Sequence, residues 1–150
     1  MEKEYLTRGD HLFVFNIGQF KLAPIICYDI RILELSRTLV VDHDVDVILH
    51  CGAYYRDESF ATWHAFVTTR SIENQAYCLS LNRAGEYFGD SLFCLPWMDD
   101  NKPPVKFDAS KEQFLCVEVK RDVTKQERES YSFLSDRLPS YSIPVMSPQQ

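Results

Sequence analysis

The residue best placed for chemistry is Cys27, which ends an apolar run and is followed at once by residues with helical spacing. A side chain at the carboxyl end of a buried strand is held by the sheet. A helix that begins there offers free N–H groups and a positive dipole end to a thiolate or an oxyanion. Burial is the competing explanation, because free cysteine is among the most buried residue types. The sequence after Cys27 has more charged residues than a plain core strand needs, which favours a reactive site. They are Asp29, Arg31, Glu34 and Arg37.

The other cysteines and the histidines show no pattern of a metal site or a disulfide framework. The five cysteines include no CxxC pair, and an odd number fits reduced thiols better than paired ones. Four of them lie in apolar strand-like runs, where burial would account for them. The four histidines lack ligand spacing, and His64, in a predicted helix behind the sheet, fits a structural role. We therefore expect no metal ion and no cofactor, and a thiol-redox role lacks a resolving cysteine near Cys27.

Composition indicates one ordinary domain with its own core. The chain has 150 residues, of which 45% are hydrophobic and 25% are charged. A net charge of −6 without a Lys/Arg-rich stripe disfavours nucleic-acid binding. No apolar run approaches the roughly 20 residues that span a bilayer, and the charged opening Met1–Glu4 is not typical of a signal peptide. We expect a cytoplasmic protein without membrane contact.

Hydrophobic periodicity predicts the elements that must position Cys27. The expected strands span residues 11–17, 20–27, 45–51, 76–81, 91–95 and 114–119, and the expected helices span residues 30–42, 57–75 and 122–130. The first two strands read as a hairpin, although Pro24 cannot donate to a ladder. Residues 97–110 are expected to form an exposed loop and residues 140–150 an extended tail. Strands alternating with helices predict an α/β fold whose sheet needs cover on both faces.

Three separated stretches, in the right order, resemble the nitrilase or carbon-nitrogen hydrolase superfamily. They are similar, in turn, to its nucleophile motif, to its pocket loop with the helix behind it, and to its closing strands and tail. The stretches are Ile26–Arg31 with Glu34, Leu35 and Arg37; then Cys51–Tyr54, Trp63–His64 and Arg70–Tyr77; then Asn82–Gly85, Phe88–Ser91 and Phe133–Pro139. The pocket and tail look most like ω-amidase-like amidohydrolases, whereas Glu2–Tyr5 and Arg8–Asp10 are similar to N-carbamoyl amino acid amidohydrolases.

The resemblance implies a single, partial domain over residues 1–150, namely the C-terminal half of an α-β-β-α sandwich. It implies a Cys-Glu-Lys mechanism on small amides, carbamoyl compounds or nitriles. Cys27 would attack the carbon bonded to nitrogen and form a thioester that water hydrolyses. The backbone N–H of Tyr28 would hold the oxyanion. The substrate pocket would be lined by Gly52, Ala53 and Tyr54.

The resemblance also implies groups that this sequence does not contain. The family's general-base glutamate and its lysine lie in an N-terminal half. Glu2 matches a second glutamate near the active site of some members, although a solvated terminal charge is the simpler explanation. For Glu73 we leave two roles open, closing a helix or standing near the nucleophile. We therefore expect a hydrolase that works as a homo-oligomer or with a complementing N-terminal half. The alternative is a non-catalytic remnant, or a subunit of a split enzyme, that acts as an interaction module.

Overall fold

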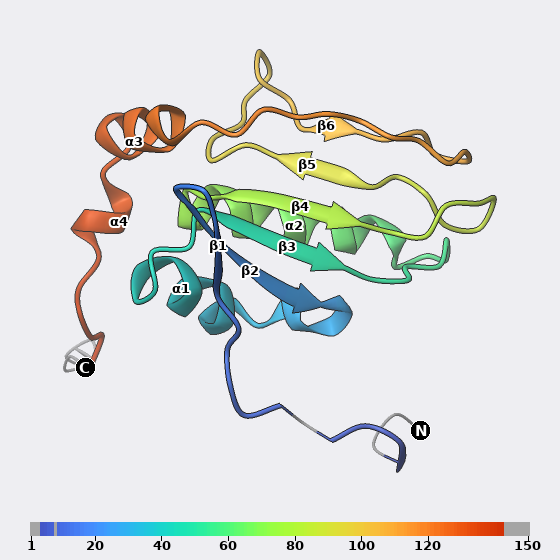
Figure 1. Cartoon of the computed structure of the whole chain (residues 1–150), viewed down its shortest axis with the longest axis horizontal. Coiled ribbons are helices and arrows are strands. Elements are labelled where there is room, and N and C mark those ends of the chain that lie inside the picture. The colour runs from blue at the N-terminus through green and yellow to red at the C-terminus, as the bar shows by residue number, and fades with distance from the viewer. Residues whose placement is uncertain (1–3, 8, 143–150) are drawn as a thin grey trace, which may run out of the picture.

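A mixed six-stranded sheet forms the centre of the molecule in the computed structural model, which describes residues 4–7 and 9–142 (Figure 1). The strands lie side by side in chain order, with β2, β3 and β4 parallel and the other neighbours antiparallel. They are β1 (Phe15–Ile17), β2 (Phe20–Ile26), β3 (Val47–Cys51), β4 (Tyr77–Leu81), β5 (Leu92–Cys94) and β6 (Val105–Lys106). The helices are α1 (Leu33–Val41), α2 (Phe60–Asn74), α3 (Arg121–Ser130) and α4 (Phe133–Asp136), with a 3₁₀ helix at Cys27–Arg31.

The expected hairpin is confirmed, with a shorter first strand. Gly18 has a φ of +58° and forms the turn between β1 and β2, a conformation that glycine adopts at no steric cost. β1 begins at Phe15, which pairs with Leu22, so β1 lies only beside the first half of β2. Pro24 lies past that point and pairs only with Leu49 of β3. Its missing N–H therefore falls on an open edge, where proline is tolerated.

One face of the sheet carries the main core. Helices α1 and α2 cover this face (Figure 1), and α2 contributes the fully buried Trp63 and Val67. The sheet side chains of this core alternate along the strands, as half-buried strands require, and include Ala23, Ile25, Ile48, Cys78, Leu92 and Cys94. Burying one such aliphatic side chain contributes about 1.5–3 kcal/mol. This core therefore fixes the strand ends near Cys27.

The opposite face is only partly covered. Val47, Tyr77 and Phe93 are buried there, and Val117, Val119 and Val123 pack against them. By the strand register, Ile26 and Leu81 lie on this same face. Their side chains are 65% and 44% exposed. The sheet thus has helices on one face and an incomplete layer on the other.

The helix expected over residues 30–42 begins later than predicted. Ile32 has an extended backbone, with φ −88° and ψ 101°, and separates the 3₁₀ helix from α1. The strand therefore passes into a single short turn before the amphipathic helix starts. A five-residue 3₁₀ helix sums few peptide dipoles, so the dipole expected at Cys27 is weaker than the sequence suggested.

Three further expectations need correction. Residues 114–119 do not form a strand, and the strand beside β5 is instead Val105–Lys106, which was expected in a loop. Helix α2 begins at Phe60, since Asp57 accepts hydrogen bonds from the N–H and hydroxyl of Ser59 in the preceding turn.

Helix α3 is found as expected. Of the expected tail, residues 140–142 have no regular structure, and 143–150 lie outside the described residues.

None of the helices within residues 4–7 and 9–142 has the length and apolar composition needed to cross a bilayer.

Candidate active site

Cys27 is the first residue of the 3₁₀ helix and follows β2 directly at a strained turn. Its φ of +44° places a non-glycine residue in the left-handed region, which costs roughly 1–2 kcal/mol. Its side chain is half-buried. Residues held in such conformations cluster at functional sites, because the surrounding structure must hold them there. The groups that hold Cys27 are therefore the first part of the site.

Two side chains bind the backbone carbonyl of Cys27. The Tyr54 hydroxyl donates to this oxygen at 2.7 Å, and His50 Nε2 donates to it at 3.1 Å. On its other side, His50 Nδ1 lies 2.6 Å from Ser80 Oγ, which also accepts the indole N–H of Trp63 at 2.9 Å. Because the carbonyl can only accept, His50 carries its proton on Nε2 and Ser80 donates to Nδ1.

Burial sets the protonation of both donors. The His50 side chain is 1% exposed, and this desolvation lowers its pKa against the raising effects of the Cys27 carbonyl and the Asp29 charge. His50 is thus the neutral imidazole. Desolvation raises the pKa of Tyr54, with the charge of Cys27 adding to the effect. Tyr54 therefore remains a phenol that can donate.

The buried His50 makes the stability of the fold pH-dependent. The folded protein keeps His50 neutral below its ordinary pKa of 6.5, while the unfolded chain takes up the proton. The contribution of His50 to the free energy of unfolding is therefore fully present above about pH 6.5. It is lost as the pH drops toward the folded pKa, by at most about 1.4 kcal/mol per pH unit. In His50→Gln this component is absent. Urea unfolding at pH values from about 7.5 to 5 should show that the free energy of unfolding depends less on pH in the variant than in the wild type. An equal pH dependence of the two proteins would contradict the assignment.

The loop Gly52–Tyr54 follows β3 and is fixed to neighbouring strands. Gly52 donates its N–H to the Leu81 carbonyl at 2.9 Å. A Cβ at Gly52 would press into the Tyr54 ring, so the tyrosine packs against the loop backbone itself. The Tyr54 ring also stacks on Trp63, with centroids 4.7 Å apart and planes within 3°. Ala53 is exposed.

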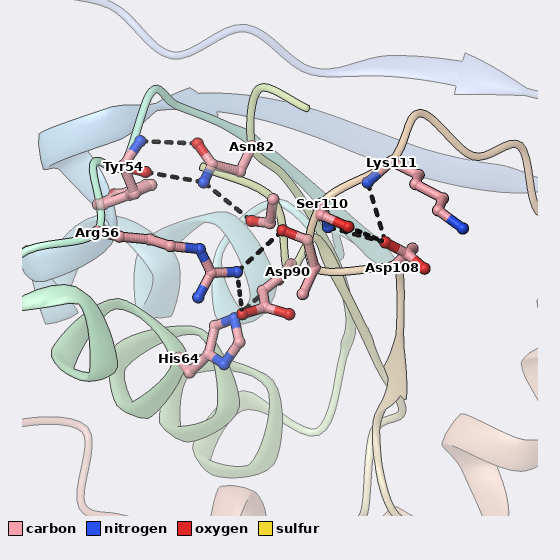
Figure 2. Close-up of polar contacts among 10 residues, drawn as sticks. Tyr54, Arg56, His64, Asn82, Asp90, Asp108, Ser110 and Lys111 are labelled. Atoms are coloured by element: carbon pink, nitrogen blue, oxygen red, sulfur yellow. Dashed lines mark hydrogen bonds and ion pairs between the residues drawn. The ribbon is translucent and has the colours of Figure 1, made fainter. Parts of the chain in front are cut away.

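The Asn82 side chain makes three hydrogen bonds, two of them to this loop (Figure 2). Its Oδ1 accepts the Tyr54 N–H at 2.7 Å, and its Nδ2 donates to the carbonyls of Tyr54 at 2.9 Å and of Gly89 at 3.0 Å. The side-chain amide is thus used as acceptor and donor together. In the sequence, Asn82 stood out as a turn residue after a strand and as part of the stretch Asn82–Gly85 that resembles the family, but neither signal indicated that it fastens the loop.

Replacing Asn82 by aspartate tests the fastening with almost no change in shape. The carboxylate of Asn82→Asp still accepts from Tyr54 but faces two carbonyl oxygens without a donor. We expect a loss of about 1–3 kcal/mol in the free energy of unfolding, measured by urea denaturation. The exposed Asn101→Asp serves as control, and equal stability of both variants would contradict the role.

Farther along the same loops, an ion pair and a histidine support the site (Figure 2). Arg56 Nη2 lies 2.7 Å from Asp90 Oδ2 and 3.1 Å from the Ala109 carbonyl. His64 Nε2 donates to the Asp90 carbonyl at 2.8 Å. The structural role expected for His64 is therefore confirmed.

Arg70 clamps the end of the turn that carries Cys27. This guanidinium, in a residue 5% exposed, donates from Nε to the Ile30 carbonyl at 2.9 Å and from Nη2 to the Arg31 carbonyl at 3.0 Å. Its Nη1 pairs with Glu73 at 2.8 Å. Glu73 therefore reaches the nucleophile turn through Arg70. The sequence analysis included Arg70 in a stretch that resembles the family but did not assign it this role, although a cation within an apolar helix face was the available signal.

The predicted site residues are only partly brought together. Cys27 and Tyr54 meet, and Tyr28 occupies the second position of the 3₁₀ helix, where an N–H has no intrahelical partner. Glu2 lies outside the described residues. No group of three or more potential metal ligands occurs in the part of the chain that the structure describes.

The expectation that burial accounts for the other four cysteines is confirmed for two of them. Cys78 and Cys94 are buried, and burial raises the pKa of both thiols. Cys51 and Cys116 are exposed, because β3 ends at Cys51 on the uncovered face and residues 114–119 form no strand.

Comparison with known proteins decides the family. The family model of carbon-nitrogen hydrolases matches residues 1–128. The chain belongs to the carbon-nitrogen hydrolase family. Among relatives of this family, the ω-amidase YafV of Escherichia coli strain K12 is 37% identical over 101 residues, which are 63% of this chain and 38% of that protein.

Solved structures show the carbon-nitrogen hydrolase fold. A superfamily member from Xanthomonas campestris matches with a TM-score of 0.77 and 21% identity, over 95% of this chain and 56% of that one. An amidase from Nesterenkonia, with the acetamide moiety of fluoroacetamide added to its active-site cysteine, matches with a TM-score of 0.62 and 22% identity, over 73% and 42%. The chain thus spans 38–56% of the length of these three relatives.

Proposed function

We propose that this chain carries the nucleophile of an amidase-type carbon-nitrogen hydrolase, and that the nucleophile is Cys27. Family membership and the ω-amidase relative support hydrolysis of amide C–N bonds in general. The observation that carries the finer proposal is the strained Cys27 backbone, held by Tyr54 and His50 at the end of a parallel strand. The substrates proposed are small amides, carbamoyl compounds or nitriles.

The proposed reaction on an amide proceeds in two stages. The Cys27 thiolate attacks the carbonyl carbon, a C–S bond forms, and the π electrons move to the oxygen. The Tyr28 N–H donates to this oxyanion. The intermediate then expels ammonia or an amine, which takes a proton from a general acid, and leaves a thioester. Water attacks the thioester and releases a carboxylic acid and the thiolate, beside a pocket lined by Gly52, Ala53 and Tyr54.

The proton transfers need a carboxylate and a cation besides Cys27. The resemblance assigns these roles to a glutamate and a lysine that this sequence does not contain, so we propose that a complementing N-terminal half supplies them. The resemblance also makes Glu2 a candidate for a second glutamate of the site. The partly covered sheet face, with Ile26 and Leu81 exposed, supports a second layer there. We further propose that this chain assembles into a homo-oligomer.

A second candidate is an interaction module without catalysis. Exposed apolar side chains in the segment after Cys27 favour it, since Ile32 and Leu33 are both exposed. Under this hypothesis Cys27 would react no faster than Cys51 or Cys116.

We also propose a cytoplasmic location. All five cysteines are free in the structure, which fits a reducing compartment.

An activated ester tests the nucleophile without requiring the missing base. Because p-nitrophenolate needs no proton to leave, p-nitrophenyl acetate should acetylate Cys27 at least about tenfold faster than the exposed thiols of Cys51 and Cys116. Peptide mapping by mass spectrometry locates the acetyl group. Acetylation at equal rates on the three cysteines, or none on Cys27, would contradict the proposed function and favour the interaction module.

A further inference from the structure

We propose that Tyr54, together with His50, is a positioning residue for the oxyanion donor: by binding the Cys27 carbonyl it aims and strengthens the N–H of Tyr28. The inference rests on the proposed function, because it concerns the same nucleophile turn. It assigns to the Tyr54 hydroxyl a role other than contact with substrate.

The geometry follows from the peptide plane. The Cys27 carbonyl and the Tyr28 N–H belong to one peptide unit, which is trans. In a trans peptide these two groups point in opposite directions. The carbonyl points at the Tyr54 hydroxyl, 2.7 Å away, and at His50 Nε2, 3.1 Å away. The Tyr28 N–H must therefore point away from both, and rotation of the plane would break both hydrogen bonds.

The same bonds polarise the peptide. Donors on a carbonyl oxygen draw electrons toward it and leave the N–H of that unit more positive, and such cooperativity strengthens a hydrogen bond by about 10–30%. The effect is larger in a buried environment, and His50 is almost fully buried. Two donors on the Cys27 carbonyl thus make the Tyr28 N–H a better partner for an oxyanion.

The donors are themselves held in place. His50 Nδ1 is bound by Ser80, and Ser80 by the Trp63 indole. The Tyr54 ring lies flat on Trp63. The network therefore exists before any substrate arrives, as preorganised transition-state stabilisation requires. It also holds the left-handed backbone of Cys27.

Two reagents separate this role from simple presentation of the sulfur. Acetylation by p-nitrophenyl acetate passes through an oxyanion, whereas alkylation by iodoacetamide does not. In Tyr54→Phe we expect Cys27 acetylation to slow about three- to tenfold, less than loss of an oxyanion donor itself, while alkylation changes by less than about twofold. Tyr77→Phe is the matched control, since its hydroxyl donates to the Lys120 carbonyl on the other face.

A second pair of variants keeps the test decisive if Tyr54→Phe does not fold. In His50→Gln the amide N–H can still donate to the Cys27 carbonyl, so the ratio of acetylation to alkylation should stay near that of the wild type. In His50→Leu the ratio should fall. Equal ratios in wild type, Tyr54→Phe and His50→Leu would overturn the inference. Failure of wild-type Cys27 to be acetylated at all would instead overturn the proposed function.

Discussion

The Cys27→Ser variant is expected to lose the fast burst of p-nitrophenolate release from p-nitrophenyl acetate and to keep only the release from Cys51 and Cys116, which is at least about tenfold slower. A serine hydroxyl is not ionised near neutral pH, whereas a cysteine thiol is partly ionised. The two side chains differ little in size, and Cys27 is only half-buried, so the fold is expected to persist. Stopped-flow release of p-nitrophenolate measures the burst.

The other exposed thiols provide the control for that result. Cys51→Ser and Cys116→Ser remove cysteines that are at least as accessible as Cys27. Both variants should retain the full burst. A fast burst that survives in Cys27→Ser, or disappears in Cys51→Ser, would contradict Cys27 as the nucleophile.

Arg70→Met is expected to give the largest loss of stability, about 2–4 kcal/mol. The substitution keeps side-chain length but removes the donors to the Ile30 and Arg31 carbonyls and the partner of Glu73. Ile30 is fully buried, so its carbonyl is left without a donor, at a cost of about 1–3 kcal/mol. Loss of a buried ion pair adds to this. Urea denaturation measures the change.

The control for Arg70 is an exposed ion pair on another helix. Lys125 and Glu129 lie 3.9 Å apart, with side chains 77% and 68% exposed. Lys125→Met should therefore change stability by less than about 0.5 kcal/mol. Acetylation of Cys27 in Arg70→Met should also slow, because the turn that carries it is released. Equal stability of the two variants would show that Arg70 does not clamp the turn.

The position of Cys27 could be predicted from local sequence, but its conformation could not. An apolar run followed by helical spacing places Cys27 at a strand end whatever the rest of the fold does. Its positive φ depends on Tyr54 and His50, which come from elements distant in sequence. The clamp from Arg70 is equally nonlocal.

Strand pairing also depends on residues distant in sequence and could not be predicted from local pattern alone. The pattern of residues 114–119 is typical of a strand, yet a strand exists only where a neighbour offers free backbone groups. Val105–Lys106 occupies the place beside β5 instead. Val117 and Val119 then pack on the sheet face, and Cys116 is exposed. The resemblance to carbon-nitrogen hydrolases was carried by motif order rather than by these details, and the family match confirmed it.

Labelling with fluoroacetamide tests the central claim most directly, because this weak electrophile carries the amide group that the proposed site should recognise. Mass mapping of the whole chain should find the acetamide group on Cys27 at least about tenfold faster than on Cys51 or Cys116, whereas iodoacetamide should discriminate less. Equal labelling of the three cysteines by fluoroacetamide, or an unmodified Cys27, would contradict the assignment of Cys27 as an amide-directed nucleophile.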